Sequence, residues 1–191
     1  AERFTHAILN PPYKKINGQS ETRKLLDAGG MEVTNLYAAF VWLAAKMLES
    51  GGELVAITPR SFCNGPYFRR FRIALLDMVA LRRIHVFESR KKAFSEDDVL
   101  QENVIFHAAR GRHKPMHVTI SSSEGSDFHK VNVRRVPYEY MVLPGDRDAF
   151  IHLVISDDDE DVVNRMRRFV TPLGELGMEV STGRVVDFRA R

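Results

Sequence analysis

The tetrapeptide Asn10-Pro11-Pro12-Tyr13 places an amide, two prolines and an aromatic ring in four consecutive positions. The Asn10 side-chain oxygen and the Pro11 carbonyl oxygen are hydrogen-bond acceptors, and the prolines stiffen the backbone that holds them. Tyr13 offers a flat face for stacking. Such a polar clamp suits the binding of a planar amide or amino group and chemistry on its nitrogen. The alternative interpretation is an ordinary turn without a functional role, because Asn-Pro and Pro-Pro are common in turns.

The clamp follows the apolar run Ala7-Ile8-Leu9, so it stands where a buried strand ends. We expect residues 4–10 to form a central strand, which needs neighbours on both sides. Only nine residues precede the clamp. The sequence therefore predicts a piece of a longer protein, and an open sheet edge through which two copies can pair as a homodimer.

The elements after the clamp alternate between two periodicities. Residues 14–30 are polar and predict a long loop. Apolar residues recur at helical spacing in residues 35–49, with Thr34 as the N-cap and Gly51-Gly52 as the end. A second helix is expected after Asn64-Gly65-Pro66. Its predicted buried stripe is Phe68, Phe71, Leu75 and Met78, and its predicted outer side is Arg69, Arg70 and Arg72.

Further strands are expected at residues 53–58, 81–87, 99–108 and 116–122. The acidic run Asp157–Asp161 predicts a helix start, because acids favour the positive end of the helix dipole. Strands that alternate with helices and then follow one another indicate an α/β sheet with a terminal hairpin.

Composition limits the class of protein. The 191 residues are 44% hydrophobic, enough for a core, and the net charge of +3 is compatible with nucleic acid without requiring it. No apolar run reaches the roughly 18 residues of a membrane span. The single Cys63 fits a reducing cytoplasm. The histidines show no metal-ligand spacing, and no serine has a matching His and acid, so neither metal nor nucleophilic catalysis is expected.

Four further segments carry a family resemblance, and they are Asn35–Phe40, Gly51–Phe62, Val99–Ile105 and Val180–Val185. With the clamp, they resemble the gamma-class DNA adenine-N6 methyltransferases of restriction-modification systems, the Eco57I-like and type I and type II modification methylases. The resemblance covers nearly the whole chain.

This resemblance implies a Rossmann-like fold that uses S-adenosylmethionine, present here as the C-terminal half of its sheet. Residues 1–155 are expected to be the C-terminal part of the catalytic domain. Residues 156–191 are expected to be a linker helix and the beginning of a target-recognition domain. The Gly-rich methyl-donor loop of the family is absent, so donor binding is expected mostly outside this chain, and the isolated chain is expected to be inactive.

In the family, the clamp holds the N6 amino group of a flipped adenine for direct methyl transfer. The resemblance therefore implies a catalytic role for Asn10, Pro11, Pro12 and Tyr13, with Tyr13 stacking on the base. Phe94, in a polar loop, is the preferred second stacking residue. Phe106 alternates like a core strand residue, which favours packing.

Basic residues near the clamp are candidates for contact with double-stranded DNA, and they are Lys14, Lys15, Arg90, Lys91 and Lys92. Basic loop residues that contact only solvent would show the same sequence pattern, so this alternative remains open. The cluster of Arg69, Arg70, Arg72, Arg82 and Arg83 is instead interpreted as a solvated helix face. A restriction or specificity subunit or domain is a further partner that the resemblance implies.

Three alternatives remain open at this point. A methyltransferase acting on a protein glutamine or on RNA needs the same clamp. A DNA-binding or assembly module retains the fold without donor binding. A separate chain can also supply the donor half.

Overall fold

The computed structural model describes residues 3–88, 102–124, 130–171 and 173–179. The chain divides into two compact units, residues 1–156 and residues 157–191. In chain order, the first unit contains β1 (Phe4–Leu9), α1 (Glu21–Ala28), α2 (Leu36–Met47), β2 (Leu48–Pro59), η1 (Arg60–Phe62), η2 (Pro66–Phe68), α3 (Arg69–Met78), β3 (Val79–Phe87), β4 (Asn103–Arg110), β5 (His117–Ser123), β6 (Val131–Pro137) and α5 (Tyr138–Met141).

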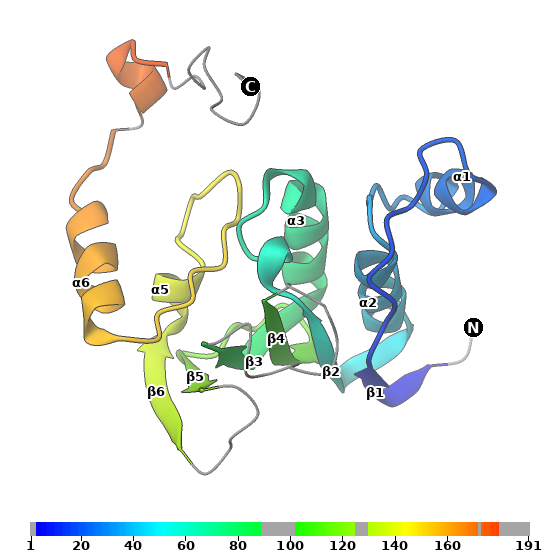
Figure 1. The fold of residues 1–191 in the computed structure, drawn as a ribbon, viewed down its shortest axis with the longest axis horizontal. Helices are drawn as coiled ribbons and strands as arrows, with labels where there is room; N and C mark the ends of the chain where they lie inside the picture. The colour runs from blue at the N-terminus through cyan, green and yellow to red at the C-terminus, as the bar shows by residue number, and fades with distance from the viewer. Residues whose placement is uncertain (1–2, 89–101, 125–129, 172, 180–191) are drawn as a thin grey trace, which may run out of the picture. The chain divides into compact units, whose positions relative to one another are not determined.

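The described strands form one six-stranded sheet in the order β1-β2-β4-β3-β5-β6 (Figure 1). β1 is parallel to β2, β3 is parallel to β5, and β4 lies antiparallel between β2 and β3. Four strands therefore point the same way, and their carboxyl ends share one edge, where open α/β sheets bind ligands. The predicted α/β class is confirmed. The hairpin expected from the consecutive strands at residues 99–108 and 116–122 is wrong, because β4 pairs with β2 and β3, and β5 pairs with β3 and β6.

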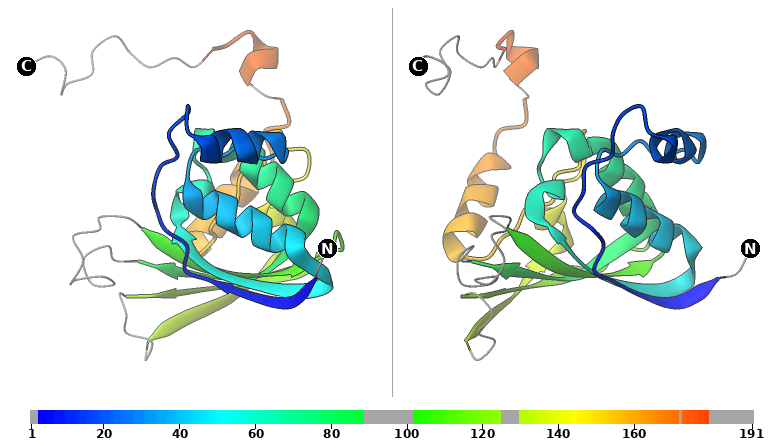
Figure 2. Two further views of the ribbon diagram at one scale, coloured as in Figure 1. Left: turned by 90° about the vertical axis from the view of Figure 1, so that its right-hand side faces the viewer. Right: turned by 45° about the vertical axis from the view of Figure 1, so that its right-hand side comes forward.

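Helices α2 and α3 cover the same face of this sheet (Figure 2). Their buried residues include Val41 and Ala45 of α2 and Leu75 of α3. On the strands, Leu54 of β2 and Phe106 of β4 are also buried. This layer fixes β2 and α3, and with them the turn that joins β2 to α3 at the carboxyl edge.

In the described part of the chain β1 is the edge strand and pairs with β2 alone, so the predicted open sheet edge is present, and the second neighbour expected for a central strand is not among the described strands. Its apolar side chains are correspondingly open to solvent, with Ile8 85% exposed. The strand itself is confirmed. The apolar run identified the element but carried no signal about how many neighbours it has.

The predicted loop at residues 14–30 contains a helix, α1. Ser20 caps it by accepting a hydrogen bond from the Arg23 backbone N–H, and Glu21 lies in its first turn. None of the α1 residues is buried. The prediction failed because α1 is a short and mostly polar helix, whose only large apolar residues are Leu25 and Leu26.

Helix α2 differs from its prediction in both its ends and its buried face. Asn35, and not Thr34, is the N-cap residue, and Gly51-Gly52 lies inside β2 instead of ending the helix. The recurring residues Phe40, Leu43 and Met47 are between 43% and 46% exposed. The opposite face is buried, and its members are Tyr37, Ala38, Ala39, Val41, Trp42 and Ala45. Small alanines let the helix approach the layer beneath it closely.

The second unit contains α6 (Asp157–Met166) and η3 (Leu173–Leu176). The first turn of α6 holds four acidic residues, which confirms the predicted helix start. No helix in the described ranges is long and apolar enough to cross a membrane.

Candidate functional site

The clamp begins where β1 ends, at the shared carboxyl edge of the sheet. Leu9 pairs with Ala56 of β2, so Asn10 emerges beside the last residues of β2. Asn10 and Pro12 are exposed, Pro11 is buried, and Tyr13 is half-buried. Burial raises the pKa of the Tyr13 hydroxyl, so this side chain stays neutral at physiological pH. The clamp thus offers an accessible amide on a rigid, partly buried support.

Backbone hydrogen bonds fasten the chain after the clamp to the start of α2. The Leu36 N–H donates to the Lys14 carbonyl at 2.9 Å, and the Ile16 N–H donates to the Thr34 carbonyl at 2.8 Å. Lys15 and Asn35 form an antiparallel bridge between these two bonds. This short ladder places Tyr13 against the first turn of α2.

Tyr37, in that turn, is the support on which Tyr13 rests. The two rings meet edge to face, with centroids 6.1 Å apart and planes at 81°. The Tyr37 ring also lies 5.5 Å from that of Phe68, and its hydroxyl lies 3.3 Å from the Ser61 Oγ. Tyr37 is only 1% exposed, and burial strongly raises its pKa. No local sequence pattern marks Tyr37 as a site residue, because its contacts join three distant segments.

The turn from η1 to α3, which carries Ser61 and Phe68, is held tight by a glycine. A Cβ atom at Gly65 would lie 2.5 Å from the Ser61 carbonyl oxygen, closer than real Cβ atoms approach. The Gly65 N–H donates to that same carbonyl at 2.8 Å. Any side chain at position 65 must therefore displace the turn that supports Tyr37.

Arg72 joins this turn to residues 146–151 and corrects the prediction of an outward-facing side chain. It is 0% exposed. Its guanidinium donates to the carbonyl oxygens of Phe62 at 3.1 Å, Gly65 at 2.7 Å and Asp148 at 2.9 and 3.0 Å. It also lies 4.8 Å from the centre of the Phe150 ring. Burial lowers the pKa of this guanidinium, and the nearby Asp148 opposes the shift.

The segment that receives Arg72 is itself ordered by hydrogen bonds. The Asp146 carboxylate accepts from the Asp148 N–H at 2.9 Å and from the Phe150 N–H at 2.8 Å. The Ile151 N–H donates to the Cys63 carbonyl at 2.9 Å. We call residues 146–151 the strap. It connects a part of the chain late in the sequence with the turn beneath the clamp.

The other predicted site residues have different positions. Lys14 and Lys15 are exposed directly after the clamp, where they are accessible to a polyanion. Phe94, Arg90, Lys91 and Lys92 lie outside the described residues. Phe106 is 1% exposed and its ring lies 5.7 Å from that of Phe62, so the prediction of a core role is confirmed. In the ranges that the structure describes, no three His, Cys, Asp or Glu residues form a metal-binding group.

The sheet order, with β4 antiparallel between β2 and β3, is that of a methyltransferase fold, and the clamp lies at the end of its β1 strand. A methyltransferase subunit of a type I restriction-modification system from Streptococcus thermophilus has a similar structure. Its TM-score is 0.53 at 16% identity, with 78% of this chain and 37% of that one covered. At this identity the likeness concerns the fold alone.

Residues 1–94 match the Eco57I restriction-modification methylase family. The chain is also 49% identical over 189 residues to the Type II methyltransferase M.PstI of Providencia stuartii. It is 49% identical over 190 residues to the Type II methyltransferase M.BsuBI of Bacillus subtilis. The chain belongs to the Eco57I restriction-modification methylase family. These alignments cover 99% and 100% of the chain but only 37% and 38% of the two relatives.

Proposed function

We propose that the intact protein methylates the N6 amino group of adenine in a specific DNA sequence, with S-adenosylmethionine as the methyl donor. The observation that carries the proposal is the position of the clamp. In a chain of the restriction-modification methylase family, Asn10-Pro11-Pro12-Tyr13 follows β1 directly at the edge where parallel sheets bind ligands.

Each clamp residue has a role in this proposal. The adenine amino group is a poor nucleophile because its lone pair is delocalised into the ring. The Asn10 oxygen and the Pro11 carbonyl accept the two amino hydrogens, which favours a pyramidal nitrogen and stabilises the positive charge that develops there. Pro11 and Pro12 hold these acceptors in place beforehand, and such preorganisation is a large part of electrostatic catalysis. The Tyr13 ring stacks on the flipped base.

The residues of this chain fit the acceptor half of the reaction and not the donor half. No Gly-rich strand-turn-helix is present in the sequence to hold the donor. S-adenosylmethionine supplies an electrophilic methyl group. We assign its binding to the part of the relatives that this chain does not span.

Duplex DNA is the proposed substrate, in the cytoplasm. Lys14 and Lys15 are exposed next to the clamp and are placed to contact phosphates on either side of the flipped base. We further propose that residues 1–155 complete the catalytic domain and that residues 156–191 begin the target-recognition domain. A restriction or specificity subunit is the proposed protein partner, and the open edge of β1 is the proposed surface for pairing of two copies.

Single-molecule sequencing of DNA from cells that express the intact protein tests the proposal. We expect N6-methyladenine in one recurring sequence, and a rate lower by on the order of a hundredfold in Asn10→Ala, by analogy with the loss of an oxyanion donor. Asn132→Ala, an exposed asparagine on β6 at the other end of the sheet, is the matched control and retains activity.

Other results of this experiment separate the alternatives. Full methylation by Asn10→Ala would refute the role of the clamp. Unmodified DNA from cells with a folded protein that binds donor would indicate a protein glutamine or RNA substrate. Unmodified DNA without donor binding would indicate a non-catalytic DNA-binding or assembly module, or a need for a second chain that supplies the donor half.

A further inference from the structure

A hollow of about 320 Å³ lies between α1 and the start of α3, outside the clamp. Three arginines line it, Arg23 from α1 and Arg69 and Arg70 from α3, together with Tyr67 and Glu32. Its volume is at the lower end of ligand-sized pockets. No sequence pattern indicates this hollow, because Arg23 and Arg70 are far apart in the chain and the spacing of the α3 arginines is typical of a solvated helix face.

Glu32 joins the two helices by pairing with arginines from both. One carboxylate oxygen lies 3.6 Å from Arg23 Nη2, and the other pairs with Arg70 Nη1. Arg23 is further fixed by Asp27 at 3.1 Å and by the Val33 carbonyl. The guanidinium groups are thus held in place before any ligand arrives. Such preorganisation reduces the entropy that binding costs.

The arginines of α3 retain capacity for a ligand. Arg69 uses its Nε atom to contact Asp148 at 2.9 Å, and Arg70 uses Nη1 to contact Glu32. Their side chains are 47% and 72% exposed. A guanidinium has five N–H donors in a planar fork, so most donors of both groups still face solvent. Planar forks of this kind bind phosphate oxygens in pairs.

Tyr67 adds an aromatic hydroxyl beside these forks. The Tyr67 side chain is 81% exposed, so it contributes little to the core. Pro66, the first residue of η2, restricts the backbone directly before Tyr67. Tyrosine hydroxyls are among the groups that contact phosphates and sugars in protein–DNA complexes.

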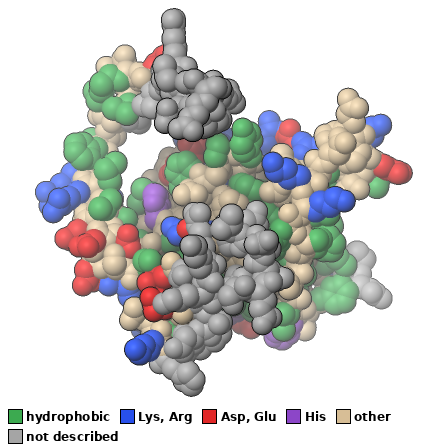
Figure 3. All heavy atoms as spheres, viewed as in Figure 1, with side chains coloured by type: hydrophobic (Ala, Val, Ile, Leu, Met, Phe, Trp, Pro, Cys, Tyr) green, Lys and Arg blue, Asp and Glu red, His purple; other side chains and the backbone are tan. Residues whose placement is uncertain are grey.

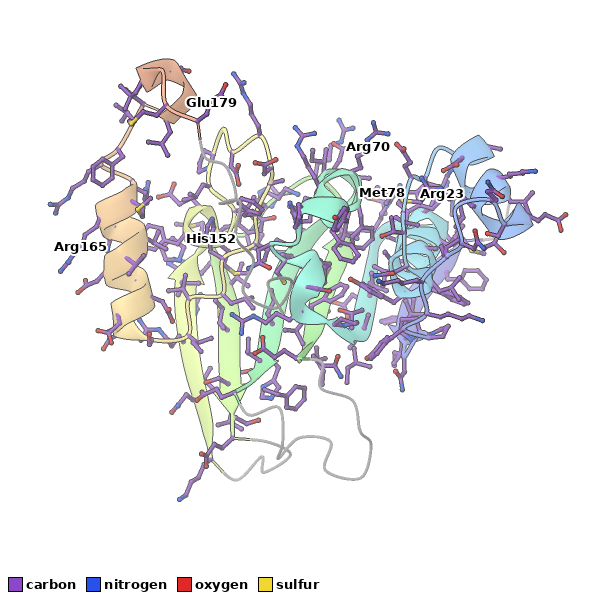
Figure 4. All side chains as sticks on the ribbon, turned by 45° about the horizontal axis from the view of Figure 1, so that its top comes forward. Arg23, Arg70, Met78, His152, Arg165 and Glu179 are labelled. Carbon is purple, nitrogen blue, oxygen red and sulfur yellow. The ribbon has the colours of Figure 1, made fainter. Side chains whose placement is uncertain are left out.

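The hollow lies on the same side of the unit as the clamp. α1 follows the clamp in the chain, and α3 follows the carboxyl end of β2, which lies next to Asn10. Figure 3 shows Lys and Arg side chains, with fewer Asp and Glu, gathered toward α1 and the start of α3. Figure 4 shows Arg23 and Arg70 on the same side of the ribbon.

We propose that this hollow binds a backbone phosphate of the DNA duplex, with Arg69 and Arg70 as the principal donors and Tyr67 beside them. The inference rests on the proposed function and extends it, because it assigns a contact that positions the duplex for the clamp. A phosphate contact carries no sequence information. The hollow therefore contributes equally to the binding of any duplex, and recognition of the target sequence lies elsewhere.

The test measures the affinity of the intact protein for duplex DNA as a function of salt. One lost phosphate contact lowers the slope of log K against log salt by about 0.9, which at about 0.1 M salt corresponds to roughly eightfold in affinity. We expect this change in Arg70→Gln and a larger one in Arg70→Glu, on duplexes with and without the target sequence. In turnover, the KM for DNA should change more than kcat.

Arg112→Gln is the matched control. Arg112 is 81% exposed and pairs with Asp77 at 3.1 Å, as Arg70 pairs with Glu32, but it follows β4 at the opposite edge of the sheet. An Arg70→Gln protein with the slope and affinity of Arg112→Gln would overturn the inference. So would a loss confined to the target sequence, because that indicates base contact. An intact protein that binds no duplex at all refutes the proposed function itself, which separates the two failures.

Discussion

Replacement of Arg72 tests whether the buried guanidinium holds the turn beneath the clamp. Arg72 is the one charged side chain in the described ranges that is fully buried, and it contacts carbonyl oxygens instead of a carboxylate. A buried charge is expensive unless every donor finds a partner. The structure comes close to this condition, because four hydrogen bonds from the five N–H donors of Arg72 link η1, Gly65 and the strap.

The magnitude follows from those bonds. A hydrogen bond to a charged group contributes about 1.5–3 kcal/mol, but four bonds from one group are not additive. Arg72→Met leaves the carbonyl oxygens of Phe62, Gly65 and Asp148 without this donor, and an unsatisfied buried acceptor costs about 1–3 kcal/mol, so we expect a loss of about 3–5 kcal/mol. Arg72→Lys keeps the charge but cannot reach three carbonyls with one ammonium, so we expect about 2–4 kcal/mol. Against a total stability of about 5–15 kcal/mol, both losses are large.

Urea unfolding of the intact protein, followed at this domain, measures the effect as a shift in the transition midpoint. Arg69→Met is the control, because Arg69 is the exposed neighbour that pairs with the Asp148 carboxylate at 2.9 Å. An exposed pair of this kind contributes about 0–1 kcal/mol. If Arg72→Met unfolded within about 1 kcal/mol of the wild type, with the same dependence on urea, the reasoning would be refuted.

Two further predictions concern Tyr37 and His152. Tyr37→Phe keeps the ring and loses the hydroxyl contacts with Ser61 and Asn35, so catalysis should change little, whereas Tyr37→Leu removes the support of Tyr13. An aromatic pair contributes about 0.5–1.5 kcal/mol, so kcat/KM should fall by about two- to twelvefold in Tyr37→Leu. The fluorescence of 2-aminopurine placed at the flipped base should also be weaker in this variant. Equal rates in Tyr37→Leu and Tyr37→Phe would contradict the supporting role of Tyr37. Burial lowers the pKa of His152, and its Nε2 is buried with no hydrogen-bond partner among the described residues. As the pH falls, His152 therefore binds its proton in the unfolded chain at a higher pH than in the folded chain. The free energy of unfolding should consequently fall as the pH drops below 6.5. His152→Gln should flatten the pH dependence of the unfolding midpoint between about pH 7.5 and 5.5, and an unchanged slope would exclude His152 as its cause.

The sequence was sufficient for elements whose signal is local. The strands β1 and β3 and the helix α6 appeared where apolar runs or an acidic first turn predicted them. The clamp could be identified as a candidate site for the same reason, because the chemistry proposed for it is contained in four consecutive residues. These predictions needed no knowledge of what lies beside each segment.

The buried faces were harder to predict, for two different reasons. α2 is apolar on almost every side, so the spacing of Phe40, Leu43 and Met47 could not show which face packs on the sheet. Arg72 was placed outside because of its charge, although it stands four residues after Phe68 and one turn from Leu76, both of which are buried. The helical spacing therefore favoured a buried position for Arg72. The carbonyl oxygens that make a buried guanidinium tolerable belong to other segments of the chain.

The geometry of the clamp depends on those distant segments even though its chemistry is local. Tyr13 rests on Tyr37, which contacts Ser61 and Phe68 on either side of the turn closed by Gly65. That turn is bonded through Arg72 to the strap. A change in the strap therefore reaches Tyr13 through a continuous series of packed and hydrogen-bonded groups, without any contact with the base. Substitutions that loosen the strap should thus weaken catalysis through the position of Tyr13, while the Asn10 amide stays exposed at the end of β1.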